Sequence, residues 1–349
     1  MSDRTIFRTI STLIPNRPRL FALLLMGWFL LAMTASAMIL QPRIVGGEDA
    51  DEDYPWMALL QLSGDHNSGS CGGTHIGEGW VLTAAHCVFF EIEDESAEDG
   101  WTDYTREPDD VAVTLGEVFF PDVGTNPGRQ FEVEEIVVHP DNYPDAARNQ
   151  HDIALLKLDT DSGDDEYLDD PVTLPSPNLD HELTPHDADA RLLGWGLQGT
   201  SEPSSYLQQL DIAIAGNAEC NESYGSTTFH DHYVCAGEEV ERFDFNPGSR
   251  SGDSGGPLLV KHDEEWVQVG VVSFGSAHLP GINIRPSHHL DWINDVTGLD
   301  FDTTPAPSSS SDSGSSDSSG AINPLLLLAL LGMVAVRFRR GTTISAGHK

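Results

Sequence analysis

The sequence contains few basic residues. Its 349 residues include 18 Lys and Arg against 56 Asp and Glu, which gives a formal net charge of −38. Because nucleic-acid binding requires clustered cations that neutralise phosphates, this imbalance argues against DNA or RNA as a partner. The excess of carboxylates instead indicates a solvated acidic surface, which keeps a protein soluble in salt.

Cysteine is also scarce. The chain has only four, Cys71, Cys87, Cys220 and Cys235. They lack the paired spacing of zinc-ligand motifs, so we expect no metal centre, and no motif indicates a cofactor. Four cysteines allow three disulfide pairings, and the sequence alone leaves all three open.

Apolar runs of the roughly 20 residues needed to cross a bilayer are missing. A shorter run near the N-terminus follows several arginines and precedes Ala35-Ser36-Ala37, which fits the rule for signal-peptide cleavage. We therefore expect a signal peptide over residues 1–37 and a short propeptide over residues 38–43, with an uncleaved membrane anchor as the alternative. Export places the chain in an oxidising compartment, where cysteines form disulfides.

The C-terminal part has a different composition from the rest. Residues 301–320 are rich in Ser, Asp and Pro, which predicts a flexible linker. Residues 321–349 carry an apolar segment followed by arginines, and they resemble bacterial C-terminal sorting tails of the GlyGly-CTERM kind. Only Gly320 stands where such tails have a glycine pair, so a plain membrane anchor is the alternative. Both readings predict an exported protein, secreted or attached to the cell envelope, with a membrane or a sorting enzyme as partner.

Between these ends, short apolar runs alternate with turn residues, which predicts strands. Many closely spaced strands indicate an all-β sandwich or barrel. We expect a short helix over residues 290–296, and strands over residues 57–62, 80–83, 111–115, 131–138, 153–158, 267–274 and 282–284.

The hexapeptide that begins at Gly252 contains the best candidate nucleophile, Ser254. A serine needs a base that takes its proton and N–H groups that receive the developing charge. His86 and Asp152 lie upstream in the order base, carboxylate, nucleophile. Each residue has a simpler explanation: His86 as a core histidine, Asp152 as a turn cap and Ser254 as a turn residue. It is very improbable that all three explanations hold together.

With Arg43-Ile44-Val45-Gly46-Gly47 and Gly194-Trp195-Gly196 added, the motifs resemble the trypsin/chymotrypsin family of serine proteases over residues 44–295. The resemblance implies a chymotrypsin-like domain over residues 44–300, built from two six-stranded antiparallel β-barrels. It implies hydrolysis of peptide bonds in protein or peptide substrates. The roles and pairings that it implies are His86 as base, Asp152 as its orienting carboxylate, Ser254 as nucleophile, Gly252 and Ser254 N–H groups as oxyanion hole, and disulfides Cys71–Cys87 and Cys220–Cys235.

The resemblance also implies a zymogen. A cut after Arg43 frees the ammonium of Ile44, which then pairs with Asp253 inside the fold, where a buried charge needs a partner. Arg43 indicates that a trypsin-like protease makes the cut, either this enzyme or another. The competing hypotheses are a catalytically inactive, protease-like binding module and a tethered surface adhesin.

Substrate preference departs from the trypsin pattern. Gly248 stands where trypsin-like members carry an aspartate, and Gly275 and Gly281 occupy the pocket walls. Ser273, Phe274 and Gly275 match the edge segment that pairs with the substrate backbone. The usual disulfide near the pocket is missing. Residues 91–110 form an acidic insertion that we expect to be a solvated surface loop.

An uncharged pocket predicts cleavage after large apolar or aromatic residues. Peptides that differ only in the residue before the cut should therefore be hydrolysed fastest with Phe, Tyr or Leu there. The measurement is kcat/KM for each peptide, and faster cleavage after Arg or Lys would overturn the prediction in favour of trypsin-like specificity.

Overall fold

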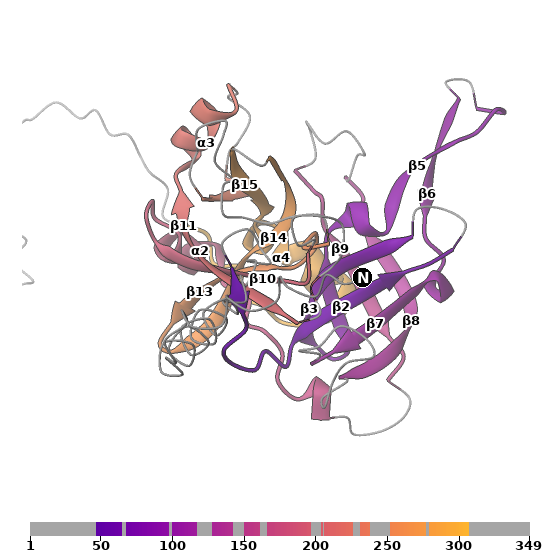
Figure 1. The fold of residues 1–349 in the computed structure, drawn as a ribbon, viewed down its shortest axis with the longest axis horizontal. Helices are drawn as coiled ribbons and strands as arrows, with labels where there is room; N and C mark the ends of the chain where they lie inside the picture. The colour runs from indigo at the N-terminus through magenta and orange to yellow at the C-terminus, as the bar shows by residue number, and fades with distance from the viewer. Residues whose placement is uncertain are drawn as a thin grey trace, which may run out of the picture. The chain divides into compact units, whose positions relative to one another are not determined.

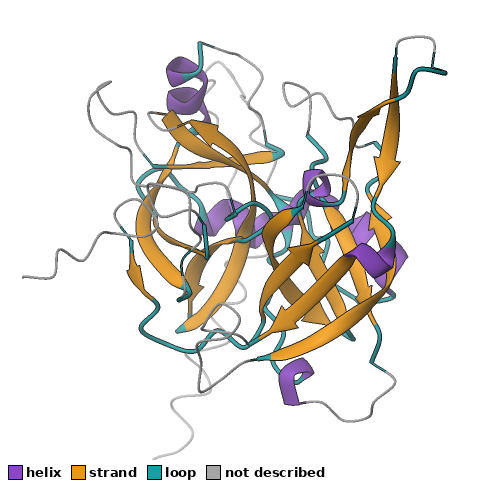
Figure 2. Ribbon diagram, turned by 45° about the vertical axis from the view of Figure 1, so that its right-hand side comes forward, coloured by secondary structure: helices purple, strands orange, loops and turns teal. Residues whose placement is uncertain are grey.

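Two closed β-barrels make up most of the described chain, as Figures 1 and 2 show. The structure is a computed structural model. It describes residues 47–64, 68–97, 100–116, 128–141, 150–160, 166–196, 204, 206–225, 231–237, 252–276 and 279–306. The expected signal peptide, propeptide and residues 307–349 lie outside this range. None of the described helices has the length and apolar character needed to span a bilayer.

The first barrel is an antiparallel ring of six strands. In the order of their pairing they are β2 (Met57–Leu62), β3 (Gly69–Gly77), β4 (Trp80–Thr83), β9 (Ala154–Leu158), β8 (Arg129–Val138) and β7 (Val111–Leu115). In β8 the buried Phe131 and Val133 alternate with the exposed Glu132 and Glu134, because successive side chains of a strand point to opposite faces. The other strands of this barrel are more fully buried, and β4 is buried throughout.

The second barrel closes in the same way, through the pairing of β11 with β12. Its ring contains β11 (Gln208–Ala215), β10 (Asp189–Gly194), β13 (Pro257–His262), β14 (Glu265–Ser276), β15 (Leu279–Ile284) and β12 (Tyr233–Ala236). The short strand β1 (Glu48–Asp49) also pairs with β11. All seven predicted strands are present in the two rings, with small shifts at their ends. The prediction of two six-stranded antiparallel barrels is confirmed.

The helical elements are short. They are α2 (Pro177–Leu183), α3 (Asn217–Ser223), α4 (Leu290–Thr297) and the single turns η1 (Ala85–Cys87), η2 (Pro108–Asp110), η4 (Glu166–Leu168) and η5 (Pro286–His289). The predicted closing helix is α4, which buries Leu290 and Ile293 and is capped by Gly298, whose φ of +74° suits glycine. Beyond α4, Asn294 exchanges two hydrogen bonds with Phe301, so contacts of the domain continue past residue 300.

The barrels meet along β3, which belongs to the first barrel. Gly72 N donates a 2.7 Å hydrogen bond to the carbonyl of Ser254, and Thr74 Oγ1 donates to Gln268 Oε1 in the second barrel at 2.7 Å. Thr74 and Gln268 are fully buried. One continuous apolar cluster includes residues of both barrels. These contacts pack the two barrels directly against each other at the place where residues of the candidate site meet.

Two disulfides brace this arrangement. Cys71 in β3 is bonded to Cys87 in η1, and Cys220 in α3 is bonded to Cys235 in β12. These are the pairings that the family resemblance implied. Each closes a loop of about 15 residues, which in the chain-entropy model stabilises a fold by about 3 kcal/mol.

The expected acidic surface loop is instead largely a β-hairpin, and this corrects the prediction. Strands β5 (Phe89–Glu93) and β6 (Trp101–Thr105) pair along their whole length and project from the first barrel (Figure 1). The buried Arg106 holds the base, because its guanidinium donates to the carbonyls of Cys87 and Ser63. Trp101 stays 48% exposed. The carboxylates Glu91, Glu93 and Asp103 share one face of the hairpin, and the apolar alternation on the other face is too short to have been recognised as a strand pattern.

The close contact at Gly72 yields a testable prediction. A Cβ at this position would lie 2.8 Å from the Cα of Gly256 and 2.9 Å from its nitrogen, so the backbone would have to shift. Gly72→Ala should lower the free energy of unfolding by about 1–3 kcal/mol, the usual cost of overpacking. Urea denaturation measures this change.

The same strand offers a matched control. A Cβ at Gly69 meets no atom within 4 Å, so Gly69→Ala should change the free energy of unfolding by no more than about 0.5 kcal/mol. Equal destabilisation by the two substitutions would show that strand propensity, rather than contact with Gly256, decides the effect.

Candidate active site

His86 lies on the turn η1 between the first barrel and the hairpin. The flanking Ala85 and Cys87 are buried, and the disulfide of Cys87 ties the turn to β3. These anchors leave the His86 side chain at the surface, where it is 40% exposed. The ring is therefore fixed at its base and open to solvent at its edge.

Asp152 immediately precedes β9 and is almost fully buried. Its carboxylate accepts hydrogen bonds from His86 N at 2.8 Å, from His86 Nδ1 at 2.8 Å and from Ser273 Oγ at 2.5 Å. Since Nδ1 faces a carboxylate, it carries the ring proton. His86 Nε2 is then the acceptor and points away from Asp152.

The two charges shift each other's titration. Burial opposes the imidazolium form, but the charge of Asp152 and its hydrogen bond outweigh this and raise the pKa of His86. Burial would raise the pKa of Asp152, but the charge of His86 and the hydrogen bonds from His86 and Ser273 lower it. The pair thus favours an ionised Asp152 beside a histidine of increased basicity.

Ser273 makes a contact in the site that could not be predicted from the sequence. We predicted that Ser273, in β14, belongs to the edge that receives the substrate backbone. That role concerns its backbone and stays a prediction; its hydroxyl donates to Asp152 and so links the second barrel to a carboxylate of the first. No local motif indicates this contact, because the two residues lie 121 positions apart in the chain.

Ser254 lies in a tight turn that begins at Gly252. Gly252 and Gly255 have φ angles of +98° and +80°, which suit glycine and strain other residues. Gly255 N donates to Val272 O at 2.8 Å, while Ser254 O accepts from Gly72 N. Both barrels therefore hold the turn in place.

The turn lies against the segment that leads to His86. A Cβ on Gly255 would overlap Thr83 Oγ1 and would lie 3.0 Å from Ala84 N. Thr83 and Ala84 directly precede η1. The structure thus brings together the Ser254 turn, the His86 turn and Asp152, which lie far apart in the sequence.

Asp253 is buried behind the turn. Its Oδ1 accepts a 2.7 Å hydrogen bond from Gly196 N, and a Cβ on Gly194 or Gly196 would overlap the carboxylate. Only glycines leave room for the side chain here. Its predicted partner Ile44, and the cleavage residue Arg43, lie outside the described residues.

The predicted pocket walls lie on neighbouring strands. Gly275 is in β14 and Gly281 in β15, and a Cβ on Gly275 would lie 3.4 Å from the Cα of Gly281. Phe274 is half-buried and pairs with Ile282. Gly248, at the predicted base of the pocket, lies outside the described residues. The two walls are therefore close together, while the base of the pocket has no structural description.

The causes of the His86 shift predict how its titration responds to mutation. Asp152→Asn removes both contributions that raise the pKa and leaves burial, so the pKa of His86 should fall to or below its ordinary value of 6.5. Ser273→Ala is the control, because it keeps the charge of Asp152; the pKa of His86 should stay raised. NMR titration of the ring measures both values. An unchanged pKa in Asp152→Asn would show that another group sets the basicity.

Comparisons with known proteins show the family to which this chain belongs. A family model described as Trypsin matches residues 44–293. Serine protease 7 of Drosophila melanogaster is 32% identical over 71% of this chain, and the chain covers 63% of the length of that relative. CLIP domain-containing serine protease B10 of Anopheles gambiae is 32% identical over 73% of this chain and 69% of its own length. Mouse tryptase is 33% identical over 74% of this chain and 90% of its own length. The chain therefore belongs to the trypsin family of serine endopeptidases.

Proposed function

We propose that this protein is an exported serine endopeptidase that hydrolyses peptide bonds in protein substrates with Ser254, His86 and Asp152. The observation that carries the proposal is the hydrogen-bonded pair of Asp152 and His86 beside the turn of Ser254. A buried carboxylate that orients a partly exposed histidine is the arrangement that activates a serine hydroxyl.

The chemistry follows from the positions of these groups. Ser254 Oγ attacks the carbonyl carbon of the scissile bond while His86 Nε2 accepts the hydroxyl proton, and His86 later gives that proton to the leaving amine. Asp152 holds the ring with Nδ1–H toward itself and stabilises the imidazolium that forms. The acyl-enzyme is then hydrolysed by water through the same proton transfers.

The developing oxyanion needs N–H donors. In this proposal they are the backbone N–H groups of Gly252 and Ser254, and the positive φ of Gly252 supports that role because it gives the turn a shape that few other residues adopt. The loss of one such donor typically raises the barrier by about 2.7–4 kcal/mol.

The protein is made as a zymogen in this proposal. Cleavage after Arg43 frees Ile44, and the new ammonium pairs with Asp253. The support is the position of Asp253, which is buried next to Ser254 with Gly196 N as a hydrogen-bond donor. An arriving positive charge would stabilise a buried carboxylate and, through its peptide bond to Ser254, the turn that carries the nucleophile. Arg43 before the cut indicates an activating protease of trypsin-like specificity, either another enzyme or this one.

The substrate pocket is proposed to accept apolar or aromatic side chains. Gly275 and Gly281 approach each other without side chains between them, and Gly248 provides no negative charge at the base. The alternative, cleavage after Arg or Lys, would need a carboxylate from another part of the chain.

Export is supported by the two disulfides, which form in oxidising compartments. The signal peptide over residues 1–37 and the tail over residues 321–349 are proposals from the sequence. The tail acts as a sorting signal or a membrane anchor in this scheme, and the linker predicted over residues 301–320 precedes it.

A fluorophosphonate probe tests both catalysis and activation, because it reacts only with an activated serine. The intact protein should label weakly, and cleavage after Arg43 should increase labelling strongly. Ser254→Ala should abolish labelling, and Arg43→Gln should keep labelling low after treatment with trypsin.

Two results would contradict the proposal. Absence of labelling in protein shown by N-terminal sequencing to begin at Ile44 would favour an inactive binding module. Strong labelling of the uncut chain and of Arg43→Gln would retain catalysis but remove the zymogen.

A further inference from the structure

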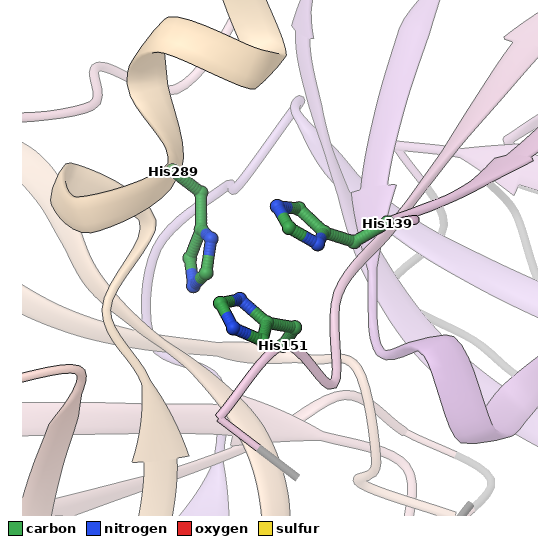
Figure 3. Close-up of side chains that lie close together, drawn as sticks. All are labelled: His139, His151 and His289. Carbon is green, nitrogen blue, oxygen red and sulfur yellow. The ribbon is translucent and has the colours of Figure 1, made fainter. Parts of the chain in front are cut away.

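A cluster of three histidines lies behind the candidate triad and takes no part in it. His139 directly follows β8, His151 precedes Asp152 and the strand β9, and His289 ends η5. Figure 3 shows the three rings facing one another from these separate segments. One ring nitrogen from each can be chosen so that all three lie within 4.8 Å of one another.

The rings are tightly packed. His139 and His151 stack with centroids 4.5 Å apart and planes 7° apart, and His289 contacts both edgewise at 5.1 and 5.2 Å. Three imidazoles in mutual contact concentrate ring nitrogens that each need a hydrogen-bond partner or a ligand.

Two of these nitrogens lack a partner. His151 Nδ1 and His289 Nε2 are buried and make no hydrogen bond within the described residues. A buried polar atom without a partner is unfavourable, so these two nitrogens favour a ligand that they can bind. His139 Nδ1 accepts a hydrogen bond from Asp141 N at 3.2 Å, at the upper end of the usual range, and a metal ion at this nitrogen would replace it.

The surroundings of the rings disfavour their charged form. Burial and the nearby histidines lower the pKa of His139 to about 4 and the pKa of His289 well below its ordinary value. Burial and His232 lower the pKa of His151. Imidazole is the commonest protein ligand for metals, and the proximity of the three rings is what allows them to share one ion.

We propose that His139, His151 and His289 bind one divalent transition-metal ion, with Zn²⁺ the best fit, and that the ion regulates the protease. Three imidazoles with water in a fourth position match zinc, whereas Ca²⁺ and Mg²⁺ prefer oxygen ligands. Zn–N bonds of about 2.0–2.1 Å place tetrahedral nitrogens about 3.4 Å apart, so the three rings close by roughly 1 Å around the ion.

The regulatory part rests on the proposed catalytic function. His151 is covalently joined to Asp152, and its carbonyl accepts from Ile153 N at 2.7 Å, while His139 N donates to Ile153 O at 3.2 Å. Drawing His151 and His139 toward an ion therefore pulls on both sides of the segment that positions Asp152. Because triad geometry tolerates little displacement, bound metal lowers activity.

Calorimetric titration of chelator-treated Ser254→Ala protein with Zn²⁺ tests the site without self-digestion. One equivalent should bind. Exchange of one ligand, in His139→Ala or His289→Phe, should weaken binding by more than the 10–100-fold that loss of an outer partner costs. His186→Ala and His262→Ala are matched controls, because these rings are 57% and 44% exposed outside the cluster; binding should be unchanged.

The unmutated rings provide a second measurement, which is informative even if a variant fails to fold. Zn²⁺ should shift the ring NMR signals of His139, His151 and His289. The metal site would be refuted if Zn²⁺ bound without shifting these signals. It would also be refuted if the affinity for Zn²⁺ fell only in the control variants His186→Ala and His262→Ala.

Activity separates this inference from the proposed function. Wild-type peptidase activity should fall as one equivalent of Zn²⁺ binds and should return with a chelator, and His289→Phe should resist this inhibition. Full activity with the site filled would overturn the regulatory link. An inactive protein that binds Zn²⁺ at the three histidines would refute the proposed function and leave the metal site standing.

Discussion

The candidate site depends on one buried carboxylate. Asp152 belongs to the first barrel. It accepts two hydrogen bonds from His86 of the same barrel and a third from Ser273 of the second barrel. An ionised carboxylate is costly to bury and is stable only when donors surround it. The junction of the barrels supplies these donors, so orienting His86 and joining the two halves of the fold are parts of the same interaction.

Glycines allow the two barrels to approach closely enough for this interaction. Gly72 contacts the backbone of the Ser254 turn, Gly255 contacts the segment before His86, and Gly194 and Gly196 make space for Asp253. A side chain at any of these positions would separate the turn from its supports. Each of these glycines allows its backbone to lie against another backbone segment or against the Asp253 carboxylate. This close approach explains why the site contains so many glycines.

The histidine cluster adjoins the segment that carries Asp152. His139 and His151 flank the same segment that carries Asp152, and His289 comes from the turn that leads into α4. The backbone of His139 and His151 therefore connects the histidine cluster to the segment that carries Asp152. In a chain with a net charge of −38, cations are attracted to the surface, which favours delivery of a metal ion.

Much of this architecture could be predicted from the sequence. Strands with clear apolar runs, such as β2, β4 and β7, have the predicted bounds, because burial on both faces leaves a local signal. The hexapeptide around Ser254, with His86 and Asp152 upstream, indicated the site by residue type and order. In contrast, β3 is rich in glycine and β11 buries the polar Gln208 and Gln209, so neither has a clear apolar pattern. The acidic hairpin was missed for a related reason.

The sequence by itself determined the fold class, the family and the identity of the candidate catalytic residues, because each is recorded in short local patterns. Only the tertiary structure decided which groups meet: Ser273 with Asp152, Gly72 with Ser254, and three histidines with one another. These contacts join residues from distant segments. They arise from barrel closure and from the packing of one barrel against the other, which no local pattern of residues specifies.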